Sequence, residues 1–182
     1  QGIKVLTNAK IDGAKLGKKG VTLEISTNGD SSTIESNLVL IAAGVQANTE
    51  NLGLEKVGVD LEKGFVKVDS KMSTNIPGIK AIGDVTGIML LAHVGMAQGV
   101  MAAELIAGQD SPPLQYQFMP RATYCHPQVA SFGLTEKQAK ESGYDVKVGK
   151  FPFQASGKAL ATGNSEGLTK VVADKKYGEI LG

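Results

Sequence analysis

The chain has 182 residues, of which 42% are hydrophobic, and its 19 lysines and arginines nearly balance its 18 aspartates and glutamates. A net charge of +1 offers no basic surface of the kind that nucleic acid or an anionic membrane attracts. The single cysteine, Cys125, excludes an internal disulfide framework and a cysteine-rich zinc site. The composition is that of an ordinary globular protein with no nucleic-acid partner.

The start of the chain shows no targeting segment, because residues 1–2 lead directly into an apolar run without a charged region before it. The absence of an initiating Met leads us to expect a trimmed or partial chain, and the absence of a targeting segment leads us to expect a protein that is not secreted. The uncharged run 85–103 contains Thr86, His93 and Gln98, so we expect a buried helix packed through its glycines and alanines rather than a membrane span.

The first third of the chain is rich in strand signals. Residues 3–7 form a short β-rich run, and residues 21–25 alternate apolar and polar side chains. The Asn-Gly pair at 28–29 predicts a tight hairpin turn, with the return strand over 32–35. The continuous apolar run 38–43 is typical of a strand buried on both faces of a sheet.

Strands and a long helix follow. Residues 64–69 alternate as a half-buried strand, and residues 79–84 predict another short strand. A helix is expected over 91–107, with Gly108 as its C-terminal stop. Beyond it the prolines at 112–113 indicate a linker, because proline lacks the N–H that a continuing helix would need.

The last third mixes one short helix with strands. Thr135 followed by Gln138 is a capping-box pattern that predicts a helix start, with Gly143 closing the helix. Strands are expected over 146–153 and 168–173. The fold class is therefore α/β, with α+β character in the C-terminal part.

Two neighbouring features could bind a ligand. Asp84 follows Gly83 at the end of an expected strand, where a carboxylate can accept hydrogen bonds from ligand hydroxyls. A turn or N-cap aspartate is the competing interpretation. Residues 90–93 lie at the start of the long helix, whose N–H groups favour partial negative charge on a bound group, but any buried helix start has the same donors.

No metal site or acid/base pair is indicated. His93 and His126 are the only histidines, and neither has a second ligand at metal-binding spacing. Cys125 and His126 would point to opposite faces of a strand, so we do not expect them to act as a pair. A lone cysteine in a β-branched and aromatic setting is interpreted as a small packed residue rather than a reactive thiol. The chain contains neither the G-x-G-x-x-G fingerprint nor a phosphate-binding G-K-[ST] loop.

Taken in order, several strings resemble successive motifs of the pyridine nucleotide-disulfide oxidoreductases, and most closely of those members that oxidise dihydrolipoyl groups. The strings are LVLIAAG at 38–44, TNIPGIKAIGDV at 74–85, LAH at 91–93, YCHPQVA at 124–130, GLTE at 133–136 and GKFPF at 149–153. The ordered series covers essentially the whole chain, although each string alone is a weak signal.

The resemblance implies part of a flavoprotein with two dinucleotide-binding domains and the start of its interface domain. Residues 1–50 would be the end of the NAD-binding domain, 51–115 the central domain that contacts FAD, and 116–182 the first part of the dimerisation domain. The glycine fingerprints and the redox-active cysteine pair would lie upstream of this stretch, and the catalytic His-Pro and its glutamate downstream. We therefore expect no catalytic residue in this chain, and no turnover by it alone.

Cofactor-binding residues are carried over by the same resemblance. Those implied for FAD are Gly83, Asp84, Leu90, Leu91, Ala92 and His93. Those implied for NAD are Gly44 and, more weakly, Ile11. One departure concerns this NAD side, because Val45-Gln46-Ala47 replaces the Arg-x-Pro that usually follows the glycine. His126-Pro127 matches a strand motif of the interface domain and not the catalytic His-Pro.

The resemblance implies electron transfer from dihydrolipoyl groups through a disulfide and FAD to NAD+, in a homodimer that serves lipoyl-bearing proteins of 2-oxo acid dehydrogenase complexes. The compartment would be the cytoplasm in a bacterium or an organelle matrix in a eukaryote. Three alternatives remain open: a related reductase such as a mercuric or glutathione reductase, a non-catalytic module derived from such an enzyme, and a small β-rich binder of hydrophobic ligands.

Overall fold

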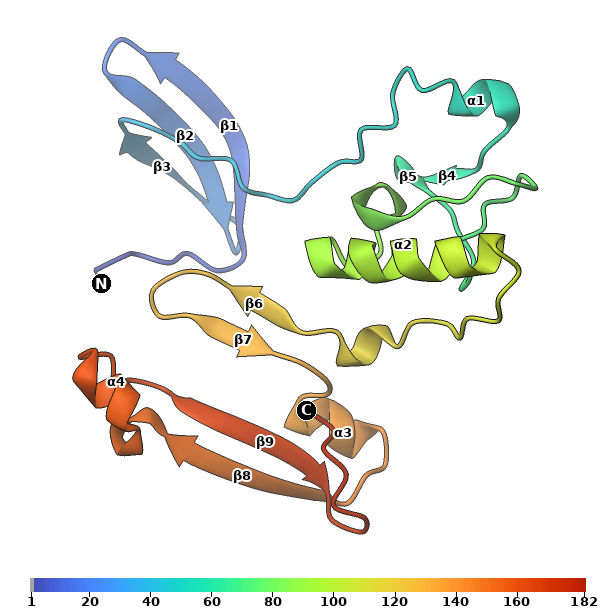
Figure 1. The fold of residues 1–182 in the computed structure, drawn as a ribbon. Helices are drawn as coiled ribbons and strands as arrows, with labels where there is room; N and C mark the ends of the chain where they lie inside the picture. The colour runs from blue at the N-terminus through green and yellow to red at the C-terminus, as the bar shows by residue number, and fades with distance from the viewer. Residues whose placement is uncertain (1) are drawn as a thin grey trace. The chain divides into compact units, whose positions relative to one another are not determined.

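The computed structural model describes residues 2–182. The chain divides into two compact units, Gln1–Val45 and Gln46–Gly182. Hairpins and short helices alternate along it, and each pairing between strands of the described residues is antiparallel (Figure 1). The chain thus mixes helix and strand, as the sequence predicts.

The first unit is a three-stranded sheet in the order β1-β2-β3, formed by β1 (Ala9–Gly17), β2 (Gly20–Thr27) and β3 (Asp30–Ser36). Asn28 and Gly29 make the turn between β2 and β3 with φ angles of 54° and 95°. Positive φ at both central residues is what a tight right-twisted hairpin requires. The predicted hairpin is therefore confirmed.

Two other strand predictions in this unit are wrong. Residues 3–7 are unpaired, and β1 begins only at Ala9. The run 38–43 is not a strand, and its side chains lie in solvent, with Leu38 89% and Leu40 90% exposed. A strand buried on both faces exists only with neighbours that pair with it and cover it, and residues 2–182 supply no pairing strand for this run.

The second unit begins with small elements around one long helix. These are α1 (Leu54–Val57), β4 (Leu61–Glu62), β5 (Phe65–Val66), the 3₁₀ turn η1 (Gly83–Thr86) and α2 (Ala92–Ile106). The strand predicted over 64–69 is reduced to the two residues of β5. The strand predicted over 79–84 keeps one bridge, between Ser73 and Lys80. Met101 and Ala102 of α2 form a buried core with Met72.

Helix α2 ends as predicted. Gly108 has a φ of 77°, and its N–H donates to the Leu105 carbonyl while the Gln109 N–H donates to that of Glu104. These two bonds satisfy carbonyls that the helix end leaves without partners, in the arrangement known as a Schellman motif. Among the described residues, no helix combines the length and the hydropathy needed to cross a membrane.

The remainder of the second unit holds two hairpins and two short helices (Figure 1). In chain order they are η2 (Tyr116–Phe118), β6 (Arg121–Thr123), β7 (Val129–Ser131), α3 (Glu136–Glu141), β8 (Val146–Pro152), η3 (Phe153–Ala155), α4 (Gly157–Ala161) and β9 (Leu168–Asp174). Strands β8 and β9 pair along their full length. A second core of Ala139, Val172 and Leu181 joins α3 to this hairpin.

Candidate functional site

The Gly83–Asp84 step forms a sharp turn with open space beside it. Gly83 has a φ of 72°, a conformation that glycine adopts without strain, and no atom lies within 4 Å of the position where its Cβ would be. Asp84 follows at the start of η1, and its side chain is exposed. A ligand can therefore approach the backbone at Gly83 and reach the Asp84 carboxylate.

Both backbone polar groups of Gly83 are fixed by side chains. Its N–H donates to Gln98 Oε1 at 2.6 Å, and its carbonyl accepts from Thr86 Oγ1 at 2.8 Å. Gln98 and Thr86 are both buried. Gln98 and Thr86 thus hold the two peptide groups on either side of the Gly83 Cα, one through its N–H and the other through its carbonyl.

The start of α2 offers backbone donors without a side-chain cap. Leu91 is the N-cap residue, with an extended backbone and no capping hydrogen bond from its side chain. Ala92 and His93, the first two residues of the helix, are exposed. First-turn N–H groups have no partner within a helix, and the helix dipole adds partial positive charge there, so this end can stabilise an anionic or electron-rich group.

The turn and the helix approach each other through glycines. A Cβ at Gly95 would lie 3.2 Å from the Gly83 Cα, and a Cβ at Gly99 would lie 3.3 Å from the Ile82 Cδ1. The close packing expected from the glycines of this run is confirmed. The structure therefore brings the predicted residues Gly83 and Asp84 against the same helix that begins with residues 90–93.

His93 is held by the backbone of a later segment. Its Nε2 atom lies 2.9 Å from the Pro120 carbonyl oxygen. The carbonyl can only accept, so this contact places the ring proton on Nε2. Among residues 2–182, no cluster of three or more histidine, cysteine, aspartate or glutamate side chains could hold a metal ion.

Two residues that sequence analysis did not assign belong to this region. Gln98 is 0% exposed, and its Nε2 donates to the Tyr116 hydroxyl at 3.0 Å. Tyr116 in turn contacts the Met72 Sδ at 4.0 Å. A polar residue within the otherwise apolar run 85–103 was the available signal for Gln98, whereas nothing in the sequence indicates Tyr116.

The residues predicted for NAD lie in the first unit. Gly44 is exposed with a φ of 107° and has no atom within 4 Å of its Cβ position. Ile11 is 61% exposed on β1, opposite the buried Ile25 of β2. Both residues are accessible to a ligand, and their role stays a prediction.

Cys125 and His126 lie in the exposed loop between β6 and β7. The interpretation of Cys125 as a packed strand residue is wrong. Its Sγ lies 3.0 Å from the Pro127 carbonyl oxygen. The cause is the length of β6, which ends at Thr123, before the cysteine.

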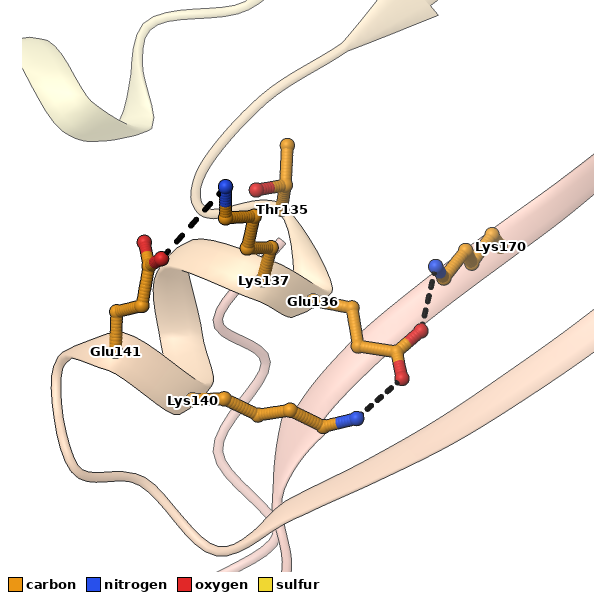
Figure 2. Close-up of a pocket in the computed structure, with 6 residues that line it drawn as sticks. All are labelled: Thr135, Glu136, Lys137, Lys140, Glu141 and Lys170. Atoms are coloured by element: carbon orange, nitrogen blue, oxygen red, sulfur yellow. Dashed lines mark hydrogen bonds and ion pairs between the residues drawn. The ribbon is translucent and has the colours of Figure 1, made fainter.

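A surface hollow beside α3 has a different character (Figure 2). It is lined by Thr135, Glu136, Lys137, Lys140, Glu141 and Lys170. Each charged side chain among them is in an ion pair: Lys137 with Glu141, and both Lys140 and Lys170 with Glu136. Hydrogen bonds from Lys140 and then Lys170 lower the pKa of Glu136 to about 2. Two of the pairs lie within α3, and the Lys170–Glu136 pair connects α3 to β9, so we interpret the hollow as structural.

Family models match most of the chain. Residues 1–99 match the model described as pyridine nucleotide-disulphide oxidoreductase, and residues 119–182 match the dimerisation domain of the same family. Relatives named dihydrolipoyl dehydrogenase are 50% identical in Mycobacterium leprae and 46% identical in Zymomonas mobilis, each over 100% of this chain. The chain spans 39% and 40% of the length of these two relatives.

Solved structures agree with the family models. LpdA from Mycobacterium tuberculosis matches with a TM-score of 0.88 and 26% identity, over 99% of this chain and 39% of that one. The HOCl-induced flavoprotein disulfide reductase RclA from Escherichia coli matches with a TM-score of 0.84 and 26% identity, over 96% of this chain and 40% of that one. With the sequence motifs, the glycine-aspartate turn and the family models in agreement, the chain belongs to the pyridine nucleotide-disulphide oxidoreductase family.

Proposed function

We propose that this chain is part of a dihydrolipoyl dehydrogenase, which oxidises dihydrolipoyl groups with FAD as cofactor and NAD+ as the final acceptor. The names of the relatives support the substrate. The observation that carries the proposal is the turn at Gly83 and Asp84 packed through Gly95 against the uncapped helix α2.

The residues present fit FAD. The open space at Gly83 admits a ligand close to the backbone, and Asp84 presents a carboxylate to accept hydrogen bonds from ribityl hydroxyls. FAD would supply the electron-accepting ring system between the dithiol and NAD+. Leu90, Leu91, Ala92 and His93 would lie at the end of the flavin where negative charge develops, and the first-turn N–H groups of α2 would stabilise that charge.

The chain's own part is therefore binding and electrostatics. Its single cysteine rules out a redox-active cysteine pair within these 182 residues. Gly44 and Ile11 would contribute to the NAD site, where Val45 replaces the usual arginine. Residues 1–50, 51–115 and 116–182 would serve as parts of the NAD-binding, central and dimerisation domains.

The partners are proposed on the same basis. The match of residues 119–182 to a dimerisation domain supports a homodimer. Lipoyl-bearing proteins of 2-oxo acid dehydrogenase complexes would deliver the dithiol. Since the relatives named above are bacterial, the cytoplasm is the compartment we propose.

The test is substitution of Asp84 in the full-length protein. We expect Asp84→Ala and Asp84→Asn to weaken FAD binding by about 10- to 100-fold, the equivalent of one charge-assisted hydrogen bond. FAD affinity is measured by reconstitution of the apoprotein, and dihydrolipoamide oxidation with NAD+ is measured alongside. Asp110→Asn changes another exposed aspartate outside the turn and serves as the control. Unchanged FAD affinity in Asp84→Ala would contradict the assignment.

The match to RclA supports a second candidate, a flavin disulfide reductase with another substrate. The wild-type protein separates the two. FAD binding together with NAD+-dependent oxidation of dihydrolipoamide supports the first, whereas FAD binding without activity on dihydrolipoamide supports the second.

A further inference from the structure

We propose that Gln98 is a positioning residue for the flavin-binding turn, acting through the Gly83 N–H and supported by Tyr116. The inference rests on the proposed function, because the turn matters only if FAD binds there. It adds to that function a buried residue that makes no contact with the cofactor itself.

The oxygen and the nitrogen of the Gln98 amide are both hydrogen bonded. Gln98 is 0% exposed, so an amide without partners at this depth would be strongly unfavourable. Its Oε1 accepts from Gly83 at 2.6 Å, and its Nε2 donates to Tyr116 at 3.0 Å. A buried amide whose oxygen and nitrogen are both hydrogen bonded has one favoured orientation, and that orientation fixes the Gly83 N–H.

The Gly83 backbone is held in place by hydrogen bonds from other residues. Gly83 has a φ of 72° and open space at its Cβ position, and it has no side chain that would restrict its backbone. Glycine has more backbone freedom than any other residue type. Gln98 holds the peptide group before Gly83, and Thr86 holds the peptide group after it. The orientation of these two groups sets the direction in which the chain continues into Asp84.

A segment that follows α2 in the chain supports both Gln98 and His93. Tyr116 lies in η2, beyond the linker at residues 112–113, and Pro120 of the same segment accepts a contact from His93. One short segment thus contacts the helix at two points, and both points are next to residues proposed to bind FAD.

The experiment measures the FAD dissociation constant of the full-length protein with substitutions at Gln98. Gln98→Met keeps the side-chain length but removes both hydrogen bonds, and we expect about tenfold weaker binding. Gln98→Glu, whose carboxyl group is neutral at this depth, keeps an acceptor for the Gly83 N–H and an O–H that can donate to the Tyr116 hydroxyl, so we expect affinity within about threefold of wild type. The visible circular dichroism of the bound flavin reports whether its orientation changes.

Two controls separate positioning from general destabilisation. Met101→Ala disrupts the same core without touching Gly83, and we expect a lower Tm with unchanged FAD affinity. Tyr116→Phe removes only the outer support, and we expect a smaller loss than in Gln98→Met. If Gln98→Met does not fold, Tyr116→Phe and Gln98→Glu decide the question.

The outcomes distinguish the two proposals. Wild-type affinity in Gln98→Met, or equal losses in Gln98→Met and Met101→Ala, would overturn the role of Gln98 while leaving the proposed function intact. Absence of FAD binding in the wild-type protein would instead remove the proposed function. Rescue by glutamate but not by methionine would support positioning through the Gly83 N–H.

Discussion

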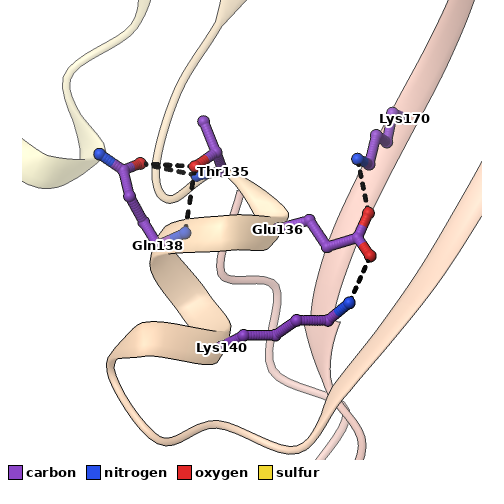
Figure 3. A network of polar contacts seen from close by, with 5 residues as sticks. All are labelled: Thr135, Glu136, Gln138, Lys140 and Lys170. Carbon is purple, nitrogen blue, oxygen red and sulfur yellow. Dashed lines mark hydrogen bonds and ion pairs between the residues drawn. The ribbon is translucent and has the colours of Figure 1, made fainter.

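Glu136 accepts one lysine on each carboxylate oxygen, with Lys140 and Lys170 both at 2.7 Å (Figure 3). Lys140 lies on the same helix, whereas Lys170 lies on β9. The pKa of Glu136 is lowered from 4.5 to about 2. Because the folded state holds the ionised form, this contribution to stability is present above pH 4.5 and is lost as the pH falls toward about 2.

Substitution of Lys170 tests this shift. We expect Lys170→Gln to raise the pKa of Glu136 toward its ordinary value, since one of its two hydrogen bonds from lysine is removed. Carbon NMR titration of the Glu136 carboxyl gives the pKa directly. Lys137→Gln is the matched control, because Lys137 pairs with Glu141 and leaves Glu136 untouched. Equal titration of Glu136 in the wild type and Lys170→Gln would rule out the pair.

Among single residues, the sequence predicts those whose role depends on their immediate neighbours in the chain. Gly83 and Asp84 could be singled out as a candidate ligand site because a glycine followed by a carboxylate at an expected strand end has a recognisable chemistry, and their role with FAD stays a prediction. Gln98 could not be assigned, because its partners Gly83 and Tyr116 lie 15 and 18 positions away. A buried amide gains its role from groups that only the folded chain brings to it.

Among the elements, α3 has the most complete start signal. The Thr135 Oγ1 accepts from the Gln138 N–H at 3.2 Å, and the Gln138 Oε1 accepts from the Thr135 N–H at 2.9 Å (Figure 3). This reciprocal pair confirms the predicted capping box. For a helix of six residues, such a cap satisfies a large share of the free N–H groups.

Removal of this cap has a measurable effect. We expect Thr135→Ala to lower the free energy of unfolding by about 1 kcal/mol. Denaturant unfolding of the full-length protein provides the measurement. Ser156→Ala at α4 is the comparison, and a smaller loss is expected there because the Ser156 Oγ accepts a longer bond, 3.4 Å from the Ala159 N–H. Equal losses at the two caps would contradict this ranking.

Helices and strands, like single residues, could be predicted where the signal lies nearby in the sequence. Hairpin β2-β3 and the C-terminal end of α2 are set by nearby turn and cap residues, so the sequence predicts them. The run 38–43 has the composition of a central strand, but a strand forms only where a partner pairs with it. Its apolar pattern is typical of a buried central strand, but residues 2–182 contain no strand that pairs with it.

The whole chain spans 39% of the relative from Mycobacterium leprae. We expect the 182 residues alone to show no reduction of lipoamide by NADH, because one cysteine cannot form a redox-active pair. A coupled NADH absorbance assay on the purified chain tests this, with the full-length protein as the positive control. Measurable turnover would show that the chemistry has been assigned to the wrong part of the protein.

The close approach of Gly95 to Gly83 gives an alanine at position 95 two opposing effects. Alanine at position 95 would favour the α2 helix by about 0.5–1 kcal/mol over glycine. The same methyl group would lie 3.2 Å from the Gly83 Cα and displace the turn by a few tenths of an ångström. The gain in helix propensity from one methyl group at position 95 is therefore set against a shift of the turn proposed to bind FAD, so the Tm and the FAD affinity of Gly95→Ala report two different effects of the same substitution.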